Sequence, residues 1–235
     1  MSEPKEYWAL KAEEYKKAGK FEDSVKMLDK VHELEKEDKA DDFWHKKAIN
    51  YCEIGEYEKA KDVLYKDLEI NQKSYETFFL MGKIFYELKK YEESLECYNK
   101  AVEEHNRQHL KNTQKIDQMK NIRKFEEAVK YSDIVHQEKQ LDHEYWYQKG
   151  MVLNKLRKFN EASSCFDIIL ETKQDNPKIL YELAKSELWA GNKQKSLEIL
   201  EKACKIEPQI KEKLKIDMDF EQMAEEKQFQ VIMGL

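Results

Sequence analysis

One short pattern occurs six times in the sequence at almost constant spacing. Each copy contains an Ala or Ser, and these small residues stand at positions 24, 60, 94, 128, 162 and 196. The steps between them are 36, 34, 34, 34 and 34 residues. A fixed period of this length is typical of chains that stack one supersecondary unit upon the next. The repeat therefore constrains the fold more strongly than any single motif.

The composition indicates what each repeated unit is made of. The chain has only 6 Gly and 3 Pro in 235 residues, whereas all-β sandwiches and barrels need turn residues every few positions. Charged residues make up 38% of the chain, which is typical of helices with one face in water. Hydrophobic residues make up 40%, too many for a disordered chain. The predicted fold class is all-α.

The positions within a unit predict two helices. We number the places of each unit from residues 5, 41, 75, 109, 143 and 177. Large residues recur at places 4 and 11 with a small residue at place 8, so the three share one face of a helix. A turn is expected near place 15, followed by a second helix with its apolar stripe at places 17, 20, 24 and 27. Small residues at places 8 and 20 would let the two helices approach closely, with aromatic residues around that contact.

The segments W-x-x-K-A-x-x-Y at residues 8–15 and 44–51, each followed by G-x-[YF]-x-x-[AS], resemble the tetratricopeptide repeat (TPR) family. The resemblance implies a right-handed superhelical solenoid of antiparallel helix pairs. The predicted repeats span residues 5–40, 41–74, 75–108, 109–142, 143–176 and 177–210. Residues 211–235 break the period and are predicted to form a C-terminal helical cap.

Two repeats and the tail depart from the pattern. In the fourth repeat Asn112 occupies place 4 and Ile116 occupies place 8, which predicts a bend or looser packing. The sixth has Glu187 and Lys193 at places that are usually in the core, as expected of a terminal unit that meets water or a cap. In the tail, Asp219 followed by Gln222 resembles a helix-start capping box. Its apolar residues would either cover the solenoid end or dock a partner.

The resemblance also implies where a ligand would bind. In the family, the first helices form the concave wall, and ligands commonly contact places 2, 5, 6, 9, 12 and 13. The predicted partner-binding residues are His45, Ile49, Phe79, Lys83, Tyr86, Lys120, Asn121, Tyr147, Met151, Asn154, Tyr181, Lys185 and Trp189. Exposed aromatic side chains on such a wall would suit a peptide-binding groove. Alternatively, some of these aromatic residues pack the first helices together.

The sequence lacks the motifs of catalysis and of cofactor binding. It contains no P-loop, G-x-G-x-x-G, H-E-x-x-H or G-x-S-x-G segment, so we expect no enzyme and no cofactor. Its four Cys residues include no C-x-x-C pair. His105 and His109 are four residues apart but straddle a predicted repeat boundary, so we expect them on different helices and predict no metal site. The Lys at place 5 and Asn at place 9 that would clamp an Hsp70 or Hsp90 C-terminal carboxylate occur together in no repeat.

These observations favour a non-enzymatic scaffold or adaptor that binds a protein or peptide. The formal net charge of −6 makes nucleic acid an unlikely partner, although RNA binding by helical repeats is one alternative. Self-assembly into a homo-oligomer through the apolar tail is another. No apolar run approaches the ~18 residues of a membrane span. The N-terminal residues have no apolar signal region, and we expect a cytoplasmic protein.

Overall fold

A computed structural model describes the backbone of residues 3–34, 43–70, 74–121 and 143–234. Side chains are described for the same residues apart from 109 and 116–121. The described parts contain α-helices, one 3-10 helix and turns, with no β-strand among them. The chain divides into two compact units, Met1–Gln108 and His109–Leu235. The all-α prediction is therefore confirmed.

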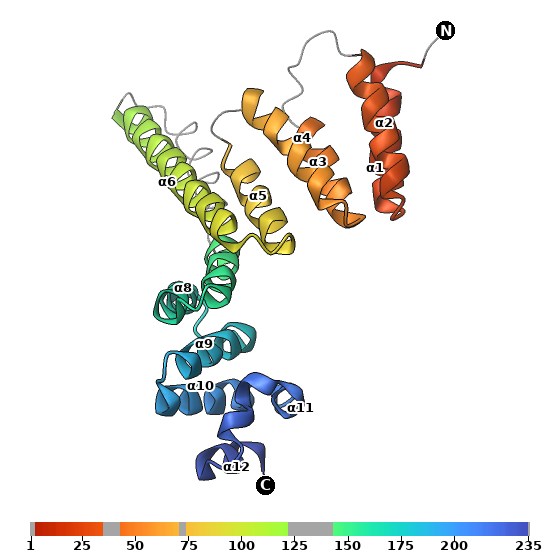
Figure 1. Ribbon diagram of the computed structural model, residues 1–235. Coiled ribbons are helices and arrows are strands. Elements are labelled where there is room, and N and C mark those ends of the chain that lie inside the picture. Colours follow the sequence, from red (N-terminus) through yellow and green to blue (C-terminus); the bar gives the residue numbers. More distant parts are fainter. Residues whose placement is uncertain (1–2, 35–42, 71–73, 122–142, 235) are drawn as a thin grey trace. The chain divides into compact units, whose positions relative to one another are not determined.

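The first unit is built from helical hairpins (Figure 1). Helices α1 (Lys5–Lys17) and α2 (Phe21–Leu34) pack on each other, as do α3 (Phe43–Glu53) and α4 (Tyr57–Ile70). Helix α5 (Tyr75–Glu87) is followed by α6 (Tyr91–Asn121), which extends into the second unit. Each hairpin reverses through a short turn at place 15. The residue there has a positive φ in every repeat for which it is described: Gly19, Gly55, Lys89, Arg157 and Gly191.

A small residue and an aromatic ring form the contact inside a hairpin, as predicted. A Cβ atom added to Gly82 at place 8 would lie 2.6 Å from the Tyr98 ring at place 24. A Cβ atom on Gly150 would lie 2.8 Å from the Phe166 ring. The two rings are fully buried. Glycine at place 8 therefore makes room for an aromatic side chain of the second helix of the same hairpin.

Serine at place 20 adds a hydrogen bond that the sequence pattern did not predict. In three repeats its hydroxyl donates to the backbone carbonyl at place 8. The bonds run from Ser24 to Ala12 at 2.8 Å, from Ser94 to Gly82 at 2.7 Å and from Ser196 to Ala184 at 2.6 Å. Because these hydroxyls are buried, the bonds satisfy polar groups that would otherwise be costly to remove from water. The two helices of these hairpins are thus joined by packing and by a polar contact.

The second unit contains two further hairpins and a tail. Residues 143–155 are helical and precede α8 (Phe159–Thr172). Helix α9 (Pro177–Trp189) starts with Pro at its first position, and the Asn176 side chain accepts hydrogen bonds from two backbone N–H groups. Helix α10 (Lys193–Ile206) packs on α9. The tail consists of α11 (Ile210–Ile216), the 3-10 helix η1 (Met218–Met223) and α12 (Lys227–Met233).

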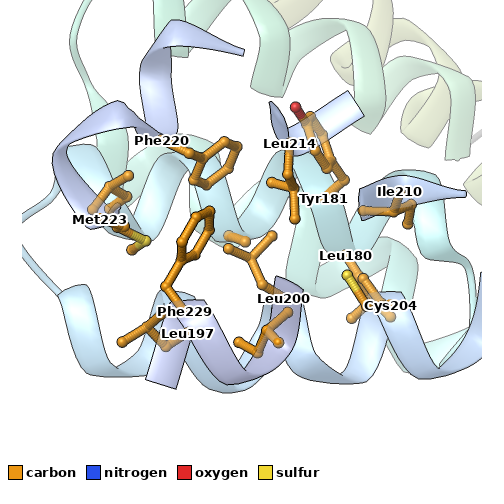
Figure 2. Packing of buried hydrophobic residues seen from close by; sticks show 14 residues of the cluster. Leu180, Tyr181, Leu197, Leu200, Cys204, Ile210, Leu214, Phe220, Met223 and Phe229 are labelled. Atoms are coloured by element: carbon orange, nitrogen blue, oxygen red, sulfur yellow. The ribbon is translucent and has the colours of Figure 1, made fainter. Parts of the chain in front are cut away.

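The tail packs on the last hairpin, where the sequence predicts a C-terminal cap. Figure 2 shows Phe220 and Phe229 of the tail in the same buried cluster as Leu197 and Leu200 of α10. Lys193, at a usual core place, donates to Glu226 of the tail at 2.6 Å. A terminal repeat lacks a following repeat, so the tail buries the surface that such a repeat would have covered.

Three local expectations need correction or fall outside the described residues. Helix α6 runs without a break across residue 108, so His105 and His109 lie on one helix rather than on two. The N-cap of η1 is Asp217, which accepts from the Asp219 backbone N–H at 3.0 Å, so the predicted capping box begins at the wrong residue. Most of the fourth repeat, residues 122–142, lies outside the described residues. The six repeat boundaries stay a prediction.

Candidate functional site

The second unit contains a groove of about 240 Å³ between the helix over 143–155 and α9. Its lining combines apolar, basic and acidic side chains. The residues are Met151, Asn154, Lys155, Arg157, Phe159, Glu182, Lys185, Trp189 and Asp219. Four of them, Met151, Asn154, Lys185 and Trp189, are predicted partner-binding residues. The structure therefore brings part of the predicted set together at one place.

Helical spacing explains why these residues share one wall. Asn154 and Lys155 follow Met151 by three and four residues. Along α9, Lys185 follows Glu182 by three residues and Trp189 follows Lys185 by four. The two helices are also joined directly, because the Ser186 hydroxyl donates to the Asn154 amide oxygen at 3.0 Å. This part-buried bond holds the two rows of side chains in register.

Two aromatic rings form the apolar part of the groove. The ring centroids of Phe159 and Trp189 are 6.0 Å apart and the rings are nearly parallel, at 21°. Trp189 is 46% exposed although it is large and apolar. A partly exposed Trp on a wall that also carries polar groups is typical of a contact point for another molecule.

The tail supplies the acidic edge of the groove. The Lys185 ammonium lies 3.1 Å from the Asp217 carboxylate and 2.5 Å from the Asp219 carboxylate. Burial alone would lower the pKa of Lys185, but the hydrogen bonds to these two carboxylates outweigh it and raise the pKa. Lys185 is therefore charged at neutral pH and already neutralised by the tail.

Glu182 is a buried acidic group beside Lys185. Burial raises the pKa of Glu182, and the nearby Lys185 and Lys213 oppose this shift. The Lys213 ammonium is 4.0 Å from the Glu182 carboxylate. The two lysines thus offset part of the free-energy cost of removing this carboxylate from water. A buried acid needs such compensation to be tolerated in the fold.

Two cations of the groove have no ion-pair partner within the described part of the chain. Lys155 ends the helix over 143–155, and Arg157 follows in the turn with φ of 59°. Both side chains are exposed. The groove thus offers, beside an aromatic surface, two positive charges that no described residue neutralises.

Two family models match the chain. The model described as anaphase-promoting complex, cyclosome, subunit 3 matches residues 11–101, and the model described as tetratricopeptide repeat matches residues 143–176. A comparison of the sequence with curated proteins finds no match.

Solved structures with the same fold are TPR proteins. One is described as YrrB, a TPR protein with an unusual peptide-binding site: identity is 21%, coverage is 86% of this chain and 85% of that chain, and the TM-score is 0.61. A MamA structure has 12% identity, covers 91% and 97% of the two chains and has a TM-score of 0.64. A MamA double mutant has 13% identity, 89% and 98% coverage and a TM-score of 0.67. The chain is a TPR protein.

In the first unit of this TPR protein, the predicted binding residues lie on α3 and α5. His45 and Ile49 of α3 are half-buried, as are Phe79 and Tyr86 of α5, while Lys83 is exposed. Lys120 and Asn121 fall at the end of α6, where side chains are not described. Their role in binding stays a prediction.

Two of the predicted aromatic contacts also serve packing within a repeat. The Phe79 centroid is 5.6 Å from Tyr98, and the Tyr147 centroid is 6.1 Å from Phe166. Tyr98 and Phe166 both occupy place 24 of the second helix. Aromatic residues at place 5 therefore pack against their own hairpin, rather than only against neighbouring first helices.

The prediction that Tyr181 is an exposed residue of the binding wall is wrong. It is only 1% exposed because the tail covers it. Its hydroxyl donates to the Asp217 carboxylate at 2.5 Å, and its ring centroid is 5.4 Å from Phe220. The tail thus occupies the part of the α9 wall around Tyr181 and Lys185.

The sequence pattern missed several groove residues for different reasons. Lys155 and Glu182 occupy places 13 and 6, which belong to the family's ligand-contacting set, so a signal was present. Phe159 was assigned to the core because of its place 17. Asp219 lies in the tail, where no repeat period indicates its position.

Burial sets the protonation state of three of the four cysteine thiols. Burial raises the pKa of Cys52, Cys97 and Cys165 to about 11 in each case, so these thiols are protonated at neutral pH. No group of three or more His, Cys, Asp or Glu residues suited to a metal ion occurs in the described ranges. Within the same ranges, no helix is long and apolar enough to cross a membrane.

Proposed function

We propose that this TPR protein is a non-enzymatic adaptor that binds a peptide segment of a partner protein on the wall formed by its first helices. The proposed site in the second unit is the groove between the helix over 143–155 and α9. The observation that supports it most strongly is Trp189, which is 46% exposed and stacks on Phe159. It lies beside Lys155 and Arg157, which have no ion pair with any described residue. Large aromatic anchors of this kind carry much of the free energy in protein interfaces.

The groove suits a peptide better than it suits a nucleic acid. Its lining contains both acidic and basic groups, and the chain as a whole carries a net charge of −6. Nucleic-acid binding depends on a basic footprint that releases counterions from phosphates. A mixed polar rim around an aromatic centre instead resembles the anatomy of protein interfaces.

The cysteines support a reducing compartment such as the cytoplasm. All four are free, and Cys97, Cys165 and Cys204 are buried. Structural disulfides are usual in oxidising compartments and rare in the cytosol. We accordingly propose a cytoplasmic setting for the adaptor.

The function is tested by selecting ligands from a displayed peptide library with the full chain. Selected peptides should bind with micromolar dissociation constants in calorimetry, and Trp189→Ala should weaken them at least about tenfold, the range of an interface hot spot. Tyr65→Ala is the matched control, because Tyr65 on α4 is 48% exposed and does not line the groove. Thermal unfolding of both variants would establish that each is folded. Failure to select any peptide, or equal binding by Trp189→Ala, would contradict the proposal.

A further inference from the structure

The contacts of the tail show what kind of group binds to Tyr181 and Lys185 of α9. Its residues 217–219 place two carboxylates on Lys185, and Asp217 also accepts from the Tyr181 hydroxyl. Tyr181 and Lys185 occupy places 5 and 9 of their repeat, which face the ligand side. The wall therefore already binds an acidic turn of its own chain.

The neighbouring part of the same wall has charges that no described group satisfies. Lys185 is shared by two tail carboxylates, and Glu182 lies within 4.0 Å of Lys213. Lys155 and Arg157, by contrast, have no ion pair with any described residue. A ligand carboxylate placed beside Lys155 and Arg157 could form ion pairs with both. It would pair with them as the Asp219 carboxylate pairs with Lys185.

An apolar surface lies within the same groove. Phe159 and Trp189 stack, and Met151 lines the groove with them. When a large apolar side chain covers such a surface, the binding free energy becomes more favourable. This contribution adds to that of any charge pairing. A ligand that used both parts would therefore need an acidic and an apolar side chain close together.

We infer that the groove recognises a peptide segment that combines acidic side chains with an aromatic or large aliphatic one. Its carboxylates pair with Lys155 and Arg157, and its apolar side chain packs on Phe159 and Trp189. This inference rests on the proposed function, since it names the class of peptide that the groove takes. It differs from capture of a C-terminal carboxylate, because side-chain carboxylates of an internal segment are sufficient.

Three synthetic peptides test the chemistry. The first is Ser-Glu-Asp-Phe-Glu-Asp-Leu-Ser with both ends blocked, the second has every Glu and Asp replaced by Lys, and the third has Phe and Leu replaced by Ser. Fluorescence anisotropy with the full chain should give micromolar binding for the first peptide and at least about tenfold weaker binding for each of the others. Binding of the first peptide should also weaken as salt is raised, because exposed charges are screened.

Charge reversal in the groove should reverse the preference. The double variant Lys155→Glu/Arg157→Glu should lose at least about tenfold in affinity for the acidic peptide, the size expected for unpaired partners in an interface, and should gain affinity for the basic one. The double variant Lys20→Glu/Lys173→Glu is the matched control, because it makes the same charge change at two exposed residues outside the groove.

The outcomes separate this inference from the proposed function. If the basic peptide binds wild type as well as the acidic one, or if the control variant loses as much affinity as the groove variant, the inference is overturned. The inference alone also fails if library-selected peptides bind in a Trp189-dependent way while the acidic peptide does not bind. If neither the library nor the panel binds, both are overturned.

Discussion

Helices α1 and α9 are both first helices of a hairpin and both have 13 residues, yet their burial differs sharply. In α1 only Ala12 is buried, whereas every residue of α9 from Ile179 to Leu188 except Lys185 is buried. Helix α9 packs against α8 and α10 and also against η1 of the tail. The same place in a repeat therefore gives an open or an enclosed helix, depending on the segments that pack against it.

The largest effect should come from removing the cover of α9. Phe220 is 1% exposed and packs on Tyr181, so Phe220→Ala should lower the free energy of unfolding by about 3–5 kcal/mol through lost burial and a residual cavity. Urea denaturation followed by circular dichroism would measure the loss. Amide hydrogen exchange should quicken in α9 and stay unchanged in α1. A loss below ~1 kcal/mol would show that the tail contributes little to the burial of α9.

A smaller, pH-dependent effect should come from the polar anchor of the tail. Asp217 is partly buried, which alone would raise its pKa, but hydrogen bonds from Tyr181, the Asp219 backbone and Lys185 lower it instead. A carboxyl with a lowered pKa stabilises the fold above its unfolded-state pKa of about 4, and this contribution is lost as the pH falls through the folded-state value.

Asp217→Asn should therefore cost about 1.5–3 kcal/mol at neutral pH, the range for hydrogen bonds to charged groups. Its difference from wild type should shrink as the pH is lowered toward about 3. Urea unfolding of both chains across this pH range gives the measurement, with Asp23→Asn on the surface of α2 as the control. A difference that stays constant with pH would contradict the assigned role of the Asp217 carboxylate.

Substitutions at the place-15 turns should change stability by similar amounts in both units. Equal effects would indicate that α1 and α9 differ in burial and not in the backbone geometry of their turns. Lys89 and Arg157 both have φ of 59°, a conformation that costs a residue with a Cβ atom roughly 1–2 kcal/mol. Glycine relieves this strain but has more entropy in the unfolded chain, so Lys89→Gly and Arg157→Gly should each raise stability by about 0.5–1 kcal/mol.

Gly55→Ala tests the same turn in the opposite direction. An added Cβ at Gly55 has nothing within 4 Å, so any loss of stability would come from the backbone conformation alone. Thermal unfolding of the three turn variants should show two gains and one loss. Unequal gains at Lys89 and Arg157 would indicate that one turn depends on its surroundings.

The smallest effect should appear on the open face of α1. Leu10 is 61% exposed, so Leu10→Ala should change the free energy of unfolding by less than about 0.5 kcal/mol. The same urea titration used for Phe220→Ala measures it. A larger loss would mean that α1 is enclosed in solution and would remove the contrast with α9.

Features that repeat along the chain could be predicted from the sequence. The turn at place 15 and the glycine at place 8 follow from local periodicity, and Gly82 against Tyr98 confirms the latter. Met151, Asn154, Lys185 and Trp189 could be assigned to one wall through the resemblance to TPR proteins, and helical spacing explains only why residues of the same helix share a face. Features without a period were missed: the continuity of α6, the cap at Asp217 and the tail over Tyr181.

The sequence alone determined that this chain forms helical hairpins, because a 34-residue period of small and large residues is satisfied by few other structures. It also determined where most hairpins turn. Only the tertiary structure decided which parts of the first helices stay open. Lys185 could face solvent or the carboxylates of Asp217 and Asp219, and the outcome depends on how the tail, over 30 residues further along the chain, packs on α9. Contacts between such distant segments leave no local pattern in the sequence.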